Sequence, residues 1–128
     1  MARKVIHSDN APQAIGPYSQ AIQVDAGKLT FLAGQIPLDP KTMEMVQGDA
    51  ATQAERVMQN LKAVLAAAGL EFSHVVRCTI FLTDLGDFAK VNEVYGRYFT
   101  GSPPARATVQ VSALPRGAKV EIDAIAVS

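Results

Sequence analysis

The segment 74–83 is predicted to form a β-strand with apolar side chains on both of its faces. Val76 stands at an even position and Phe81 at an odd one, so their side chains point to opposite faces of the strand. Two other expected strands, 28–33 and 119–127, have the same two-sided character. Burying apolar surface contributes about 25 cal/mol per Å², so a large uncovered face would be costly. Helices that lie on one face of a sheet leave its other face open. We therefore expect a homo-oligomer in which sheets pack together.

Helical spacing is clearest over residues 49–68, where apolar residues recur every three or four positions. Asp49 suits the N-cap of this helix, and Gly69 suits the position just after its end. A second helix is expected over residues 88–99. Gly96 inside it costs about 1 kcal/mol relative to alanine, so we expect close packing against the helix backbone there.

Two β-hairpins are expected. The first joins 18–24 to 28–33 across a short loop that contains Gly27. The second joins 105–112 to 119–127 through a turn at Leu114-Pro115-Arg116-Gly117. With a short first strand at 3–7 and at most a short strand within 43–46, the 128 residues form a single α+β domain, a sandwich with two helices on one face of the sheet.

Composition limits the partners of this domain. Lysine and arginine total 12 and aspartate and glutamate total 12, so the net charge is zero and nucleic acid is an unlikely partner. The single cysteine excludes an internal disulfide and favours a reducing compartment. No apolar leader and no stretch of membrane-spanning length is present, so we expect a cytoplasmic protein without a membrane partner.

Few residues have the spacing of a known catalytic group. Cys78 alternates with apolar residues on one strand face, which is typical of a buried cysteine that acts as a small hydrophobic residue. His7 and His74 have no partners at metal-ligand or triad spacing, so no metal site is expected. No glycine-rich segment matches a phosphate-binding loop.

Arg106 and Glu121 each interrupt a mostly apolar strand, where an unpaired charge is costly. They could form a structural ion pair, Arg106 could face solvent, or both could serve a site. The expected hairpin would align Arg106 with Ala124, which leaves Glu121 three residues or roughly 10 Å further along the strand. The two side chains need not meet within one chain, although a site between subunits could collect both.

Several motifs together resemble the RidA/YjgF family of reactive-intermediate deaminases over essentially the whole chain. They are Ile15-Gly16-Pro17-Tyr18-Ser19-Gln20, Gly34-Gln35-Ile36-Pro37, Asp87-Phe88 with Val91-Asn92, Pro104-Ala105-Arg106-Ala107, Ala113-Leu114-Pro115 and Val120-Glu121-Ile122. The resemblance implies a chorismate-mutase-like α+β fold and a homotrimer whose sheets form a central barrel, with clefts between subunits. It also implies hydrolysis of 2-aminoacrylate and related enamines or 2-imino acids to 2-oxo acids and ammonia, without a cofactor.

The resemblance also implies roles for individual residues. Arg106 would bind the substrate carboxylate, and Glu121 would position or polarise the attacking water. Tyr18 would form a wall of the cleft, Gly34 would bring backbone close to the ligand, and Asn92 would support the site.

Two residues depart from the pattern of many relatives. Thr108 stands at a substrate-binding position where they have cysteine, which argues against an obligatory thiol in the reaction. Ala33 stands where they often have serine, which removes a hydroxyl and leaves the substrate range and rate open. Two other functions remain in view: an endoribonuclease or translation inhibitor, and a trimer that binds small carboxylates without turnover.

Overall fold

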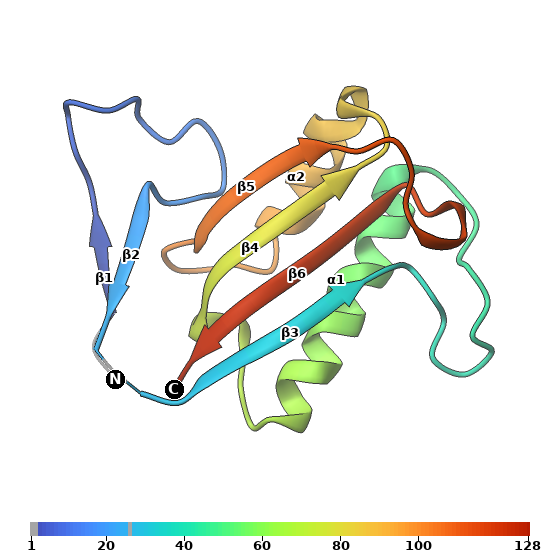
Figure 1. The fold of residues 1–128 in the computed structure, drawn as a ribbon, viewed down its shortest axis with the longest axis horizontal. Helices are drawn as coiled ribbons and strands as arrows, with labels where there is room; N and C mark the ends of the chain where they lie inside the picture. Colours follow the sequence, from blue (N-terminus) through green and yellow to red (C-terminus); the bar gives the residue numbers. More distant parts are fainter. Residues whose placement is uncertain (1–2, 26) are drawn as a thin grey trace.

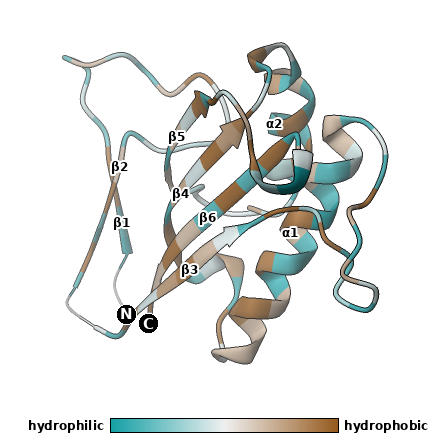
Figure 2. Ribbon diagram, turned by 45° about the vertical axis from the view of Figure 1, so that its right-hand side comes forward, coloured by the Kyte–Doolittle hydropathy of each residue, from teal (hydrophilic) through white to brown (hydrophobic). Residues whose placement is uncertain are grey.

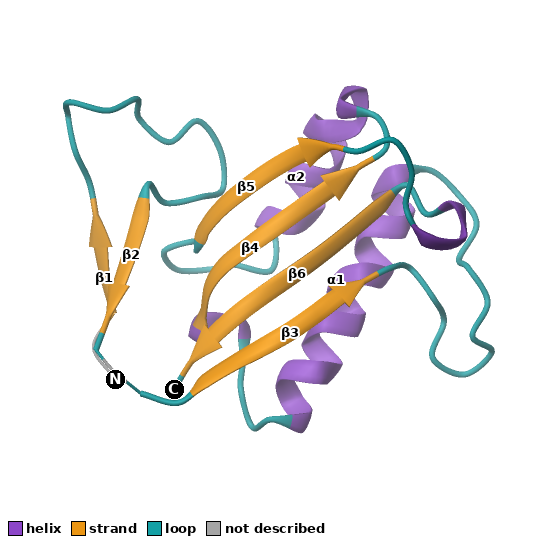
Figure 3. Cartoon of the chain, viewed as in Figure 1, coloured by secondary structure: helices purple, strands orange, loops and turns teal. Residues whose placement is uncertain are grey.

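The computed structural model describes residues 3–25 and 27–128, and its centre is a four-stranded mixed sheet with two helices on one face (Figure 1). The strand order is β3-β6-β4-β5, with β4 and β5 parallel and the other pairs antiparallel. The bounds are β3 (Leu29–Gln35), β6 (Val120–Val127), β4 (Val75–Leu82), β5 (Ala105–Gln110), α1 (Ala50–Ala67) and α2 (Phe88–Gly96). Figure 3 shows both helices behind the sheet, so the predicted α+β class with helices on one face is confirmed.

The predicted hairpin between 105–112 and 119–127 is wrong, because β4 lies between β5 and β6 and pairs with both. The β4–α2–β5 unit is a parallel crossover, which places β5 beside β4 on the outer edge of the sheet. Residues Pro115–Gly117 form a short 3₁₀ turn in which Arg116 has a φ of 57°, and the chain then runs into β6. The two central positions go to β4 and β6, both of which were expected to be apolar on both faces.

The predicted hairpin between 18–24 and 28–33 is also wrong. β2 (Ala21–Val24) pairs instead with β1 (Arg3–Ile6) in a separate two-stranded ribbon, which Figure 1 shows beside the main sheet, and β3 pairs with β6. The Arg3 guanidinium fastens this ribbon to the body by donating hydrogen bonds to the carbonyl oxygens of Ser73, Val75 and Ser102 at 2.7–3.0 Å. Within 43–46 only an isolated bridge forms, between Leu38 and Met45.

The caps of α1 follow the prediction. The Asp49 carboxylate accepts a hydrogen bond from the Thr52 amide at 2.9 Å, which lowers the pKa of Asp49, and Gly69 follows the helix with a φ of 74°. α2 ends at Gly96, earlier than predicted, because the amides of 97–99 bond three residues back instead of four. A Cβ added at Gly96 would lie 3.4 Å from Cβ of Pro17, so the predicted close packing is confirmed. Within the described ranges, neither helix has the length and apolarity needed to cross a bilayer.

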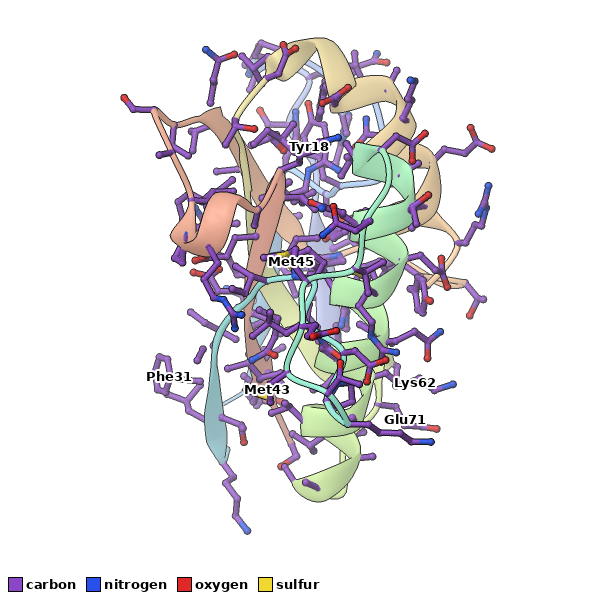
Figure 4. The ribbon with its side chains drawn as sticks, turned by 90° about the vertical axis from the view of Figure 1, so that its right-hand side faces the viewer. Tyr18, Phe31, Met43, Met45, Lys62 and Glu71 are labelled. Atoms are coloured by element: carbon purple, nitrogen blue, oxygen red, sulfur yellow. The ribbon has the colours of Figure 1, made fainter. Side chains whose placement is uncertain are left out.

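The two faces of the sheet differ in cover. Side chains that face the helices, such as Ile80 on β4 and Ile122 on β6, are fully buried. On the other face Phe31 is 71% exposed and Val109 is 41% exposed, although Figure 2 shows hydrophobic residues along β4 and β6. Phe31 points away from α1 in Figure 4. The predicted subunit contact through this face remains a prediction, because one chain does not test it.

Candidate functional site

Arg106 lies on the edge strand β5 with its side chain on the helix-covered face of the sheet. Its Nη1 donates a hydrogen bond to Oδ1 of Asn92 on α2 at 2.6 Å. Its Cζ lies 5.2–5.5 Å from the ring centroids of Tyr18, Phe88 and Tyr95. The guanidinium therefore sits among three aromatic rings, with one amide oxygen fixing its orientation.

Within the described ranges, Arg106 has no carboxylate within ion-pair distance. The ion-pair alternative from the sequence is therefore wrong for a single chain. Burial lowers the pKa of Arg106, but a guanidinium stays protonated at any pH that a folded protein meets. A half-buried cation with one amide partner and three ring faces is suited to receive a carboxylate in bidentate geometry.

The loop before β2 brings Tyr18 to this cation. A Cβ added at Gly16 would lie 3.4 Å from Nδ2 of Asn92 and 3.8 Å from Nη2 of Arg106, so the loop backbone runs closely past both side chains. The Ser19 amide donates to the Pro104 carbonyl at 3.1 Å, just before β5 begins. Chain segments almost ninety residues apart are thereby held together around Arg106.

Glu121 lies on β6 beside a bulge in β3. The pairing of β3 with β6 shifts between Leu32 and Gln35, and Gly34 lies within that irregular stretch. A Cβ added at Gly34 would overlap Oε2 of Glu121 and lie 2.9 Å from its Cδ. Only glycine leaves the Glu121 carboxylate in this position.

Arg106 and Glu121 lie on opposite faces of the sheet. Arg106 on β5 pairs with Cys78 on β4, and Cys78 pairs with Ala124 on β6, so the three residues lie in one row across the sheet. Cys78 and Ala124 are buried against the helices, so this row faces the helices. Successive side chains of β6 alternate between the two faces, which turns Glu121 to the uncovered face. As expected from the sequence, one chain does not bring the two side chains together.

Thr108 follows Arg106 on the same side of β5. Its Oγ1 is buried and, like the Tyr95 hydroxyl, has no hydrogen-bond partner among the described residues. Cys78 is 2% exposed, as expected for a core residue, and burial raises the pKa of its thiol to about 12. The thiol is therefore protonated at neutral pH and is a poor nucleophile.

The two histidines serve local structure. His74 Nδ1 accepts a hydrogen bond from the Glu71 amide at 3.0 Å, and His7 lies 2.9 Å from the exposed carboxylate of Asp9. Residues 3–25 and 27–128 contain no cluster of three or more side chains that could hold a metal ion.

The contacts of Phe88 and Tyr95 with Arg106 were not predicted from the sequence. The available signal was their spacing, because Phe88, Asn92 and Tyr95 fall at i, i+4 and i+7 on one face of α2. A polar residue between two aromatic ones on that face marks where the helix meets a charged partner.

Gly34→Ala should displace the Glu121 carboxylate. The added methyl group would occupy the space of Oε2, and the bulge is fixed by flanking strand pairing, so the side chain must turn away. We expect any activity that needs Glu121 to fall at least about tenfold, with a smaller effect on ligand affinity at Arg106. Steady-state kinetics beside thermal melts measures both.

Gly101→Ala is the matched control, because a Cβ at that exposed glycine meets nothing within 4 Å. It should leave the kinetics unchanged. Equal effects of the two alanine substitutions would contradict the assigned role of Gly34.

Comparison with known proteins places this geometry in a family. The family model described as Endoribonuclease L-PSP matches residues 8–128. Protein DfrA of Myxococcus xanthus is 88% identical over 128 residues, covering 100% of this chain and 98% of the relative. The 2-iminobutanoate/2-iminopropanoate deaminase of Mus musculus is 52% identical over 125 residues, covering 98% and 91%.

A solved structure agrees with these relatives. The crystal structure of RidA from an Antarctic Psychrobacter species has a TM-score of 0.77 and 46% identity, and the match covers 98% of this chain and 99% of that one. The chain therefore belongs to the RidA/YjgF family.

Proposed function

We propose that this protein hydrolyses 2-aminoacrylate and related 2-imino acids to 2-oxo acids and ammonia. The observation that carries the proposal is the half-buried guanidinium of Arg106, which Asn92 and three rings orient and which no carboxylate in the described chain neutralises. A small α-carboxylate matches that cation in charge and shape. The name of the mouse relative, a 2-imino acid deaminase at 52% identity, supports the same substrate class.

The reaction needs a fixed carboxylate, a water and a group that moves protons. Arg106 would hold the substrate carboxylate through charge-assisted hydrogen bonds worth about 1.5–3 kcal/mol each, with Tyr18 as a wall. Tautomerisation, in which the β-carbon of the enamine gains a proton and the nitrogen loses one, gives the imine. Water then adds to the imine carbon, and the nitrogen leaves as ammonia. Glu121 would accept the proton from water and return it to the departing nitrogen.

The site would be completed by a second subunit. Arg106, Asn92 and Tyr18 lie toward one edge of the sheet, while Gly34 and Glu121 lie on the opposite face near the other edge. A homotrimer whose uncovered sheet faces form a central barrel would bury Phe31 and its neighbours and would place these two groups against each other across subunit boundaries.

Phe31→Glu should disrupt this assembly, because it places a charge on the uncovered face, where Phe31 is 71% exposed in the single chain. Light scattering should give the wild type three times the chain mass of 13.6 kDa and the variant a smaller mass with less activity. Lys28→Glu, which keeps a charged side chain at an exposed position just before β3, is the control and should remain trimeric. A wild-type monomer at micromolar concentration would remove the basis for a shared site.

The deciding experiment measures release of ammonia and 2-oxo acid from freshly generated 2-aminoacrylate, above the uncatalysed rate. The family description raises endoribonuclease as a second candidate, so RNA cleavage is measured in parallel, although zero net charge disfavours an extended nucleic-acid interface. Carboxylate binding without product release would indicate a non-catalytic binding protein.

A further inference from the structure

A cavity lies away from Arg106, between α1, the end of β3 and the loop that joins them. It has a volume of about 360 Å³. Its lining includes Ile36, Leu38, Met43, Arg56, Asn60 and Val64. Figure 4 shows Met43 between β3 and α1, where the loop crosses the gap.

The walls of this cavity are fixed by hydrogen bonds. Nδ2 of Asn60 donates to the carbonyl oxygens of Ile36 at 3.2 Å and Leu38 at 3.0 Å, which ties the start of the loop to α1. Nε2 of Gln53 donates to the Val46 carbonyl at 3.0 Å and ties down its end. The loop therefore holds the space open between two anchored points, as expected of a preformed ligand site.

The same loop carries an unusual backbone conformation. Among the described residues, the only non-glycine residues with positive φ are Met43, at 60°, and Arg116, at 57°. They contact each other, since Nη1 of Arg116 donates to the Met43 carbonyl at 3.0 Å. Such conformations cost free energy and are concentrated at functional loops. The strain here lies at the rim of the cavity.

Charge and polarity are unevenly distributed in the lining. Arg56 is half-buried, and its Nε donates to Oδ1 of Asn60 at 3.1 Å. Across the described chain, no carboxylate lies within ion-pair distance of Arg56. Leu38, Met43 and Val64 supply apolar surface, and the last two remain 58% and 39% exposed.

We propose that this cavity is a binding site for a short aliphatic monocarboxylate. Arg56 binds the carboxylate, and the side chains of Leu38, Met43 and Val64 contact the hydrocarbon chain. One guanidinium neutralises one negative charge, so a monoanion matches better than a phosphate ester. At about 30 Å³ for each water-sized group, the volume holds roughly a dozen non-hydrogen atoms.

This cavity and the proposed deaminase site share the backbone of Gly34, which lines the cavity and also packs against Glu121, but they use different cations. Arg106 lies on β5, at the edge of the sheet opposite β3, and Glu121 faces the uncovered side, whereas Arg56 lies on α1. The proposal therefore stands or fails separately from the deaminase activity.

Hexanoate is the probe, and the methyl group of Met43 is the reporter. The full chain is labelled with ¹³C-methyl methionine and titrated with hexanoate while NMR spectra are recorded. We expect a saturable shift of the Met43 signal with a Kd of about 1 mM, and no shift of Met58, which is fully buried in the core. Hexan-1-ol and hexylamine should give little shift. The response should persist in Arg106→Gln, which removes the other anion site.

Two variants locate the binding. Arg56→Gln should weaken hexanoate binding at least about tenfold. Ala63→Leu should fill the cavity and abolish the shift, while Ala67→Leu, at an exposed position on α1 outside the lining, should leave it unchanged. The proposal is overturned if Met43 does not respond, if the alcohol or amine binds equally well, or if Arg56→Gln binds with unchanged affinity.

Discussion

Arg106→Lys should lower kcat/KM by about 30- to 1,000-fold while the protein stays folded, which corresponds to about 2–4 kcal/mol of transition-state stabilisation. The substitution keeps the positive charge but removes the planar fork that binds a carboxylate through two parallel hydrogen bonds. It also removes the bond from Nη1 to Asn92, so the remaining ammonium is free to move among the three rings. Steady-state kinetics on 2-aminoacrylate measures the effect.

A matched control tests whether the effect is specific to the guanidinium at position 106 or follows from any arginine-to-lysine substitution. Arg97, the exposed C-cap residue of α2, forms a surface pair with Glu93 at 2.9 Å, and such pairs contribute little. Arg97→Lys should therefore leave both kinetics and melting temperature nearly unchanged. If Arg106→Lys lowers the melting temperature but the folded enzyme keeps its specific activity, Arg106 has a structural role only.

Local sequence patterns were sufficient to predict the helices. The caps of α1 depend on Asp49 and Gly69, and each acts within a few residues of its own position. The close contact at Gly96 could also be predicted, because an unfavourable glycine inside a helix needs a packing reason. Its partner, Pro17, could not be predicted, because a glycine indicates a close contact but does not indicate which residue makes it.

Strand pairing was not predicted, because it depends on competition between distant segments. The turn at 114–117 is compatible with a hairpin, but β4 offers both β5 and β6 a partner that is apolar on both faces. The parallel crossover through α2 then fixes β5 at the sheet edge. The simplest assumption was that strands adjacent in sequence pair with each other. Burial of β4 between β5 and β6 is more favourable than that pairing.

The candidate site was predicted in part for the same reason. Arg106 and Glu121 stand out as charges in apolar strands, and that signal is local. The ring contacts of Arg106 involve Tyr18, which is 88 positions away along the chain and is brought close by backbone bonds near Ser19. Which face each charge occupies depended on the sheet order, so the separation of Arg106 from Glu121 needed the structure.

Glu121→Gln should lower kcat by about 100- to 10,000-fold, the usual range for loss of a general base. Glutamine keeps the shape that fits against Gly34 but does not accept a proton from water. Affinity for a 2-oxo acid should change much less, because Arg106 binds the carboxylate. Glu93→Gln, on the exposed face of α2, is the matched control and should retain full activity. A loss of affinity equal to the loss of kcat would argue against a proton-transfer role.

Mixing the two inactive variants tests whether the site is shared between subunits. If Arg106 of one subunit works with Glu121 of the next, co-expressed Arg106→Lys and Glu121→Gln chains form some sites in which both residues are wild type. With equal amounts and random assembly, roughly a quarter of the sites should be intact, because each of the two residues is wild type in half of the chains. Activity should return to about that fraction of the wild type. If each site lay within a single chain, every site would carry one of the two defects and no activity would return. Arg106 and Glu121 lie on opposite faces of one sheet, which favours the shared site. Absence of recovery in mixed oligomers, with their composition confirmed by mass, would contradict the intersubunit arrangement.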